Sequence, residues 1–98
     1  MTPAPEAREP GEPLEVLVLT QEDCELCERA RELLARLSEE YPFSIRALAS
    51  ASSQGRELAA SGGILFAPGI FIDGVPFSYG RVSERKLRRE LERRLVGA

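Results

Sequence analysis

A C-x-x-C pair between a predicted strand and a predicted helix constrains this chain more than any other feature. The pair is Cys24-Glu25-Leu26-Cys27, and the chain has no other cysteine. It follows the apolar run Leu14 to Thr20, whose continuous valine and leucine content predicts a strand buried on both faces. It opens the stretch Leu26 to Leu37, in which apolar residues recur at helical spacing. Two cysteines at such a corner are typical of a dithiol redox site.

The start of the predicted helix explains why cysteines there are reactive. Unpaired backbone N–H groups and the positive end of the helix dipole meet in the first turn. Both favour the thiolate, which is the form of cysteine that attacks disulfides. We therefore expect Cys24 to be the exposed nucleophile and Cys27 to be a deeper resolving thiol. Asp23 is the predicted N-cap of the helix, and Leu26 is expected on its buried face.

The rest of the chain alternates between strand and helix signals. A strand is predicted over Phe43 to Leu48, and a short helix from Ser52 or Ser53 to Ala60. Asp73-Gly74 predicts a tight hairpin turn between two short strands, the second of which contains Pro76 and should lie at a sheet edge. Ser83 is expected to cap a last helix. The predicted order is β-α-β-α-β-β-α.

Size and charge limit the function classes. Ninety-eight residues suit one domain, and a net charge of −3 argues against nucleic-acid binding, which needs a positive patch. No apolar run is long enough to span a bilayer. Residues 1–13 contain four prolines and predict a disordered tail, followed by a domain over residues 14–98. The N-terminus has no basic start followed by an apolar core, so we expect no secretory signal and a cytoplasmic location.

The element order, the C-x-x-C pair after the first strand and Ala67-Pro68 before the third resemble the thioredoxin-like superfamily, most closely its small glutaredoxin-like members. The resemblance covers about residues 14–96. It implies an α/β thioredoxin-like fold, with a four-stranded mixed sheet flanked by three helices. It also implies that Pro68 is cis and faces the dithiol, and that the backbone of Ala67 binds substrate.

Several positions depart from the typical family motifs. Glutaredoxins usually carry Pro-Tyr between the cysteines, where this chain has Glu25-Leu26. The Gly-Gly plus acidic motif that holds glutathione is not recognisable in Tyr79-Gly80-Arg81-Val82-Ser83. No organic cofactor is expected, and glutathione stays open as a co-substrate.

Charged residues around the cysteines give a second expectation. Nearby negative charge disfavours a thiolate, so an acidic cluster should leave the Cys24 pKa less depressed than in strong oxidants, and the pair should act as a reductant. The same cluster should favour a substrate with basic residues near its disulfide. The cluster is formed by Glu22, Asp23, Glu25 and Glu28. Arginines that fold near the site would offset this charge, and the candidates are Arg81, Arg85 and Arg56.

Two hypotheses for the function of the cysteines remain open. The first is a thiol–disulfide oxidoreductase that reduces protein or small-molecule disulfides, with Cys24 and Cys27 catalytic and with Ala67 and Pro68 binding substrate. Its expected partners are a disulfide-containing substrate and a reductase or glutathione as electron donor, with no nucleic acid, no membrane and a monomeric chain. The alternative is a non-catalytic module that binds a partner protein or a soft metal such as Cu(I) through the two thiolates. No zinc site is expected, because a structural zinc ion usually takes four Cys or His ligands and this chain has two cysteines and no histidine.

Overall fold

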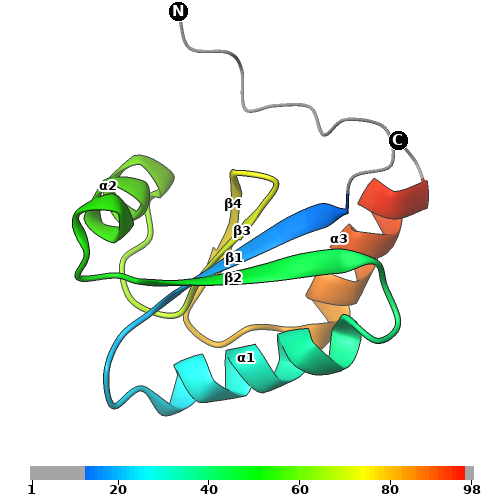
Figure 1. Ribbon diagram of the computed structural model, residues 1–98, viewed down its shortest axis with the longest axis horizontal. Helices are drawn as coiled ribbons and strands as arrows, with labels where there is room; N and C mark the ends of the chain where they lie inside the picture. The colour runs from blue at the N-terminus through cyan, green and yellow to red at the C-terminus, as the bar shows by residue number, and fades with distance from the viewer. Residues whose placement is uncertain (1–12, 97–98) are drawn as a thin grey trace, which may run out of the picture.

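The fold is organised around a central strand, β1 (Leu14–Thr20). The computed structural model describes residues 13–96, so the expected tail lies outside the described residues except for Pro13. β1 pairs in parallel with β2 (Phe43–Ala49) and antiparallel with β3 (Gly69–Ile72), which pairs antiparallel with β4 (Val75–Tyr79). The sheet order is β2-β1-β3-β4, which confirms the predicted four-stranded mixed sheet (Figure 1).

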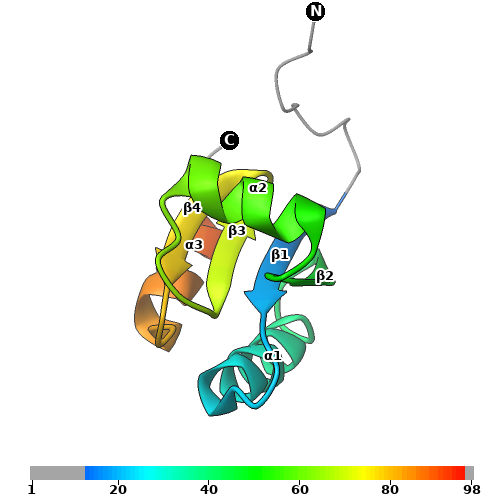
Figure 2. The same ribbon diagram turned by 90° about the vertical axis from the view of Figure 1, so that its left-hand side faces the viewer.

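Helices cover both faces of the sheet (Figures 1 and 2). α1 (Glu25–Leu37) and α3 (Glu84–Val96) lie on one face, and α2 (Ser53–Gly62) lies on the other. None of the helices in residues 13–96 is long and apolar enough to cross a bilayer.

The side chains of β1 alternate between two cores, as the pleat of a strand requires. Val16 and Val18 are fully buried in the larger core, beneath α1 and α3. Leu17 and Leu19 lie in the smaller core, which α2 covers. The prediction that β1 is buried on both faces is therefore confirmed.

Turns and caps follow the predicted chemistry in most places. Asp73 and Gly74 have φ angles of 50° and 80°, as the tight hairpin turn requires. The strand that contains Pro76 is at the sheet edge, as expected. The hydroxyl of Ser52 accepts the Gly55 N–H at 3.0 Å, and the hydroxyl of Ser83 accepts the Lys86 N–H at 3.2 Å. These contacts are the N-caps of α2 and α3.

Two expectations at the start of α1 are wrong. Asp23 has a φ of 52°, in the left-handed region, so it does not adopt the extended conformation of an N-cap. Cys24 is the cap instead, with φ −117° and ψ 102°. Leu26 is only half-buried, because Cys27 takes the first core-facing position of the helix, ahead of Ala30.

α2 approaches the end of β2 so closely that one of its positions has no room for a side chain. A Cβ built on Gly55 would lie 2.1 Å from the Ala49 carbonyl oxygen and 2.9 Å from Ser50 Cα. Both atoms belong to the backbone, so the contact cannot be relieved by a change of rotamer.

We therefore predict that Gly55→Ala destabilises the protein, although alanine is ordinarily the better helix former. Overpacking costs about 1–3 kcal/mol, which exceeds or cancels the gain of about 1 kcal/mol in helix propensity. Urea unfolding measures the difference. Ser53→Ala, at the exposed start of the same helix, is the matched control and should be nearly neutral. A Gly55→Ala protein more stable than wild type would contradict the close packing.

Charged contacts join α3 to the end of α1. The Arg88 guanidinium donates to both carboxylate oxygens of Glu40, at 2.8 and 2.9 Å, and to Glu84 at 3.0 Å. It also lies 6.0 Å from the ring centre of Tyr41. Hydrogen bonds from Arg88 lower the pKa of Glu40 and the pKa of Glu84 from the ordinary 4.5.

These shifts predict a pH dependence of stability. A carboxyl group with a lowered pKa in the folded state contributes stability above its unfolded pKa, and this is lost as the pH falls through the folded pKa. The melting temperature of the wild type should therefore fall more steeply below about pH 4.5 than that of Arg88→Met, with the two proteins differing by a few degrees at pH 7. Arg89→Met, on the exposed side of α3, is the control. Parallel curves for wild type and Arg88→Met would contradict the role of Arg88.

Candidate functional site

The two cysteines lie at the junction of β1 and α1 and are joined by a disulfide. Their Cα atoms are 5.2 Å apart. Cys24 Sγ accepts a hydrogen bond from the Cys27 backbone N–H at 3.1 Å, so the sulfur itself caps the helix. This N–H is one of those left without a partner at a helix start, and it would stabilise negative charge on the sulfur in the reduced protein.

The two sulfurs differ in exposure. Cys24 is half-buried, whereas Cys27 is 3% exposed and packs on the core side of the helix. The expected depth difference between them is thus present. It leaves Cys24 as the cysteine that an incoming disulfide can approach.

The strand register places Ala67-Pro68 at the end of the sheet from which the chain leads to the dithiol. Leu19 in β1 pairs with Gly69 in β3, so Pro68 lies beside Thr20, where β1 ends and the chain turns toward Cys24. The Ala67–Pro68 bond is cis, as the family resemblance implied. Pro68 is fully buried, and its carbonyl accepts the Gly80 N–H at 2.9 Å.

The backbone of Ala67 differs from that of Pro68 in its hydrogen bonding. Neither its N–H nor its carbonyl makes a hydrogen bond to another group in residues 13–96. Its predecessor Phe66 is 57% exposed and packs edge-on against Tyr79, with ring centres 5.0 Å apart. Phe77, in β4, packs against the larger core.

A cavity of about 230 Å³ opens beside the disulfide. We call it the dithiol cavity, and its lining residues are Thr20, Gln21, Asp23, Cys24, Cys27, Glu28 and Arg31. Of the acidic cluster expected from the sequence, Asp23 and Glu28 reach this cavity, together with one cation that sequence reasoning missed, Arg31. Its position seven residues after Cys24 would have indicated that both lie on one side of the helix.

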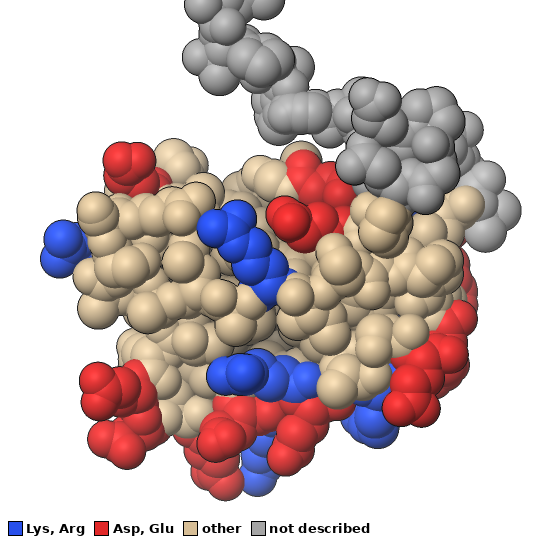
Figure 3. Space-filling view, in the orientation of Figure 1, with Lys and Arg blue, Asp and Glu red and all other residues tan. Residues whose placement is uncertain are grey.

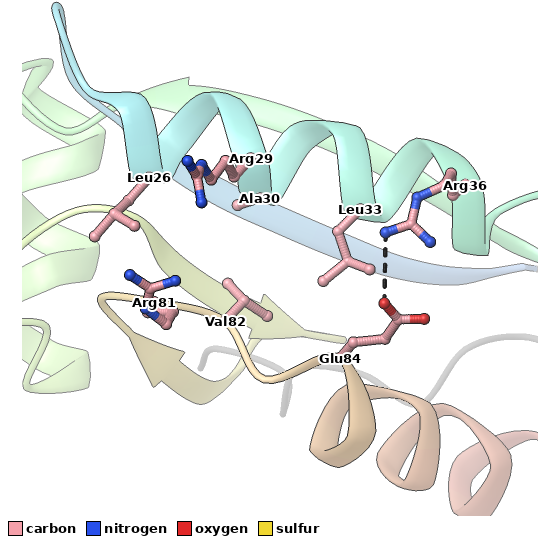
Figure 4. Close-up of a pocket in the computed structure, with 8 residues that line it drawn as sticks. All are labelled: Leu26, Arg29, Ala30, Leu33, Arg36, Arg81, Val82 and Glu84. Carbon is pink, nitrogen blue, oxygen red and sulfur yellow. Dashed lines mark hydrogen bonds and ion pairs between the residues drawn. The ribbon is translucent and has the colours of Figure 1, made fainter.

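A second pocket, of about 200 Å³, lies between α1 and the segment that leads into α3 (Figure 4). We call it the arginine groove, and it is lined by Leu26, Arg29, Ala30, Leu33, Arg36, Arg81, Val82 and Glu84. Of the three arginines named as candidates to offset the acidic charge, Arg81 lines this groove together with Leu26 of the C-x-x-C segment. Arg85 lines a different surface of α3, and Arg56 lies on α2, across the sheet.

The surface along α1 carries both signs of charge. Figure 3 shows acidic and basic side chains interspersed along the lower edge of the molecule, where α1 runs. Within residues 13–96, no group of three or more His, Cys, Asp or Glu side chains is arranged to hold a metal ion.

Solved structures share this architecture. A thioredoxin from Halobacterium salinarum aligns with a TM-score of 0.63 at 17% identity, covering 81% of this chain and 72% of that one. A thioredoxin-like protein from Clostridium perfringens aligns at 0.67 and 15%, covering 84% and 72%. Glutaredoxin 1 from Francisella tularensis aligns at 0.53 and 19%, covering 87% and 99%. At these identities the likeness establishes the fold.

Sequence relatives are found in mycobacteria. Uncharacterised proteins of Mycobacterium tuberculosis and Mycobacterium bovis are 33% identical to this chain over 87 residues, which is 86% of this chain and 89% of each relative. No family model matches the sequence. The fold and the cysteine pair together support a redox-type function. The chain has a thioredoxin-like fold, and it belongs to the same family as these mycobacterial proteins.

Proposed function

We propose that this protein is a thiol–disulfide oxidoreductase that reduces disulfides of protein or small-molecule substrates. One observation carries the proposal: the half-buried Cys24 sulfur caps α1 and is paired with the buried Cys27. A structural disulfide needs neither the helix cap nor the difference in exposure, whereas a nucleophile and a resolving thiol need both.

The reaction transfers two electrons from the dithiol to the substrate. The Cys24 thiolate attacks one sulfur of the substrate disulfide, and that bond breaks as a mixed disulfide forms. The first substrate sulfur leaves as a thiolate and takes up a proton. Cys27 then loses its proton, attacks Cys24 Sγ and releases the second substrate sulfur as a thiol. The protein ends as the Cys24–Cys27 disulfide, and two molecules of a monothiol such as glutathione, or one dithiol reductase, return the two electrons.

Backbone groups, and no side-chain base, activate Cys24 in this proposal. The chain has no histidine, so a Cys-His pair is excluded. The Cys27 N–H and the dipole of α1 favour the thiolate. Asp23 and Glu28, which line the same cavity, oppose it, while Arg31 partly compensates. This balance suits a reductant, because a strong oxidant needs an unusually stable thiolate.

The free backbone of Ala67 is the proposed docking point for the substrate chain. An extended segment could donate to its carbonyl and accept from its N–H, as an added strand does at a sheet edge. Pro68 holds that backbone beside Thr20, because its own carbonyl is fixed by Gly80. The exposed ring of Phe66 extends the surface with apolar area. The proposal includes a cytoplasmic location, where thiol donors keep such pairs reduced.

Replacing the resolving cysteine should trap the first intermediate. In Cys27→Ser, the mixed disulfide between Cys24 and a substrate cannot be resolved within the protein. We expect this variant, offered a peptide disulfide, to accumulate the covalent adduct to near completion, while wild type accumulates about a tenth as much or less. Non-reducing mass spectrometry measures the adduct.

Cys24→Ser is the matched control, since it keeps one thiol but removes the exposed one. It should form little adduct, because Cys27 is 3% exposed. Equal trapping by the two variants would contradict the assigned roles. No adduct in either would contradict exchange chemistry at this pair.

A further inference from the structure

The arginine groove begins at the dithiol but is separate from the dithiol cavity. Leu26, which stands between the two cysteines, forms its near end, and the Arg36–Glu84 ion pair closes its far end at 3.4 Å (Figure 4). On α1, groove residues and cavity residues each recur at three- or four-residue spacing, so they form separate rows. The two pockets share no lining residue.

Two cations at the near end are available to a ligand. Arg81 is exposed and makes no ion pair within the described part of the chain. Among residues 13–96, Arg29 pairs with Glu25 alone, at 3.3 Å, and both side chains are largely exposed, so this contact is weak. Figure 4 shows the Arg29 and Arg81 side chains beside Leu26, one from each wall of the groove.

The one acidic residue of the groove does not neutralise this end. Glu84 accepts from Arg88 at 3.0 Å and from Arg36 at 3.4 Å, so it is already paired twice. The near end thus keeps unbalanced positive charge, whereas Asp23 and Glu28 on the other flank of α1 outnumber Arg31. The two sides of the dithiol therefore carry opposite charge.

The floor of the groove is apolar. Leu26, Leu33 and Val82 contribute aliphatic side chains beneath the guanidinium groups. A volume of about 200 Å³ accommodates one side chain of moderate length but not a folded element. A glutamate fits this chemistry, because its methylene groups can cover the apolar floor while its carboxylate meets two guanidinium groups.

We infer that the arginine groove binds an acidic side chain of a protein substrate next to the disulfide that Cys24 attacks, with Arg29 and Arg81 as the carboxylate ligands. The inference rests on the proposed function, because it assigns substrate specificity to the same site. It revises the expectation of a basic substrate: the acidic residues face one flank of the dithiol, and the cationic groove receives the chain on the other.

The test compares three peptides that differ only in charge. Each carries one cysteine as a mixed disulfide with 2-mercaptoethanol, flanked on both sides by two Glu, two Gln or two Lys residues. Single-turnover rate constants for reduction by the dithiol protein are divided by those for dithiothreitol, which removes the effect of the flanking charges on the peptide disulfide itself. The proteins are wild type, the double variant Arg29→Gln/Arg81→Gln, and Arg56→Gln as a matched loss of charge on α2.

We expect wild type to reduce the Glu peptide about fivefold faster than the Gln peptide, the size of one or two exposed ion pairs. This preference should shrink as ionic strength rises. The double variant should reduce the two peptides at nearly equal rates, while Arg56→Gln keeps the preference. Equal rates in wild type, or a preference unchanged in the double variant, would overturn the inference and leave the proposed function standing. If the protein reduced none of the three peptides, the proposed function would be wrong, and so would this inference.

Discussion

Burial of β1 on both faces is the constraint on which the rest of the structure depends. β1 is enclosed by two cores, so the chain leaves the sheet where the strand ends. A short loop then leads directly into α1. The start of α1 is therefore held just beyond the C-terminal end of β1, where the first N–H groups of a helix have no partner within the helix. Cys24 occupies that start, so its position follows from the burial of valines and leucines several residues earlier.

The pairing of β3 with β1 also fixes the position of Ala67-Pro68. β3 pairs with β1 in a register that ends at Leu19 and Gly69, which leaves Pro68 beside Thr20. The backbone of Ala67, which makes no hydrogen bond within residues 13–96, lies at the same end of the sheet as the start of α1. Two segments more than 40 residues apart in the sequence thus lie at the same end of one sheet, because they flank neighbouring strands.

Much of this arrangement could be predicted from the sequence, because it depends on local patterns. The run of Leu and Val residues indicated a central strand, Asp73-Gly74 indicated the hairpin turn, and serine residues indicated two helix caps. The cysteine depth difference followed from helical spacing alone. Each of these signals is contained in a few neighbouring residues.

The wrong cap prediction and the unpredicted groove each have a physical cause. Aspartate is a favoured N-cap residue, so Asp23 was the predicted cap. In the structure Asp23 has a left-handed backbone conformation, and the sulfur of Cys24 caps α1 instead. The arginine groove could not be predicted, because Arg29 and Arg81 lie on separate segments that only the packing of the segment before α3 against α1 brings together. Charge counted along the sequence suggested an acidic site, whereas in the fold acidic residues outnumber arginines in the dithiol cavity and arginines outnumber acidic residues in the arginine groove.

The central claim is that Cys24 and Cys27 form a redox-active pair, and an equilibrium titration tests it most directly. The protein would be equilibrated in glutathione buffers of defined potential, and free thiols would be alkylated and counted by mass. The account predicts one reversible two-electron transition with a midpoint between about −180 and −280 mV, the range of known exchange-active dithiols. Thiols that stay unpaired across that range, or a disulfide that stays intact throughout it, would contradict the account.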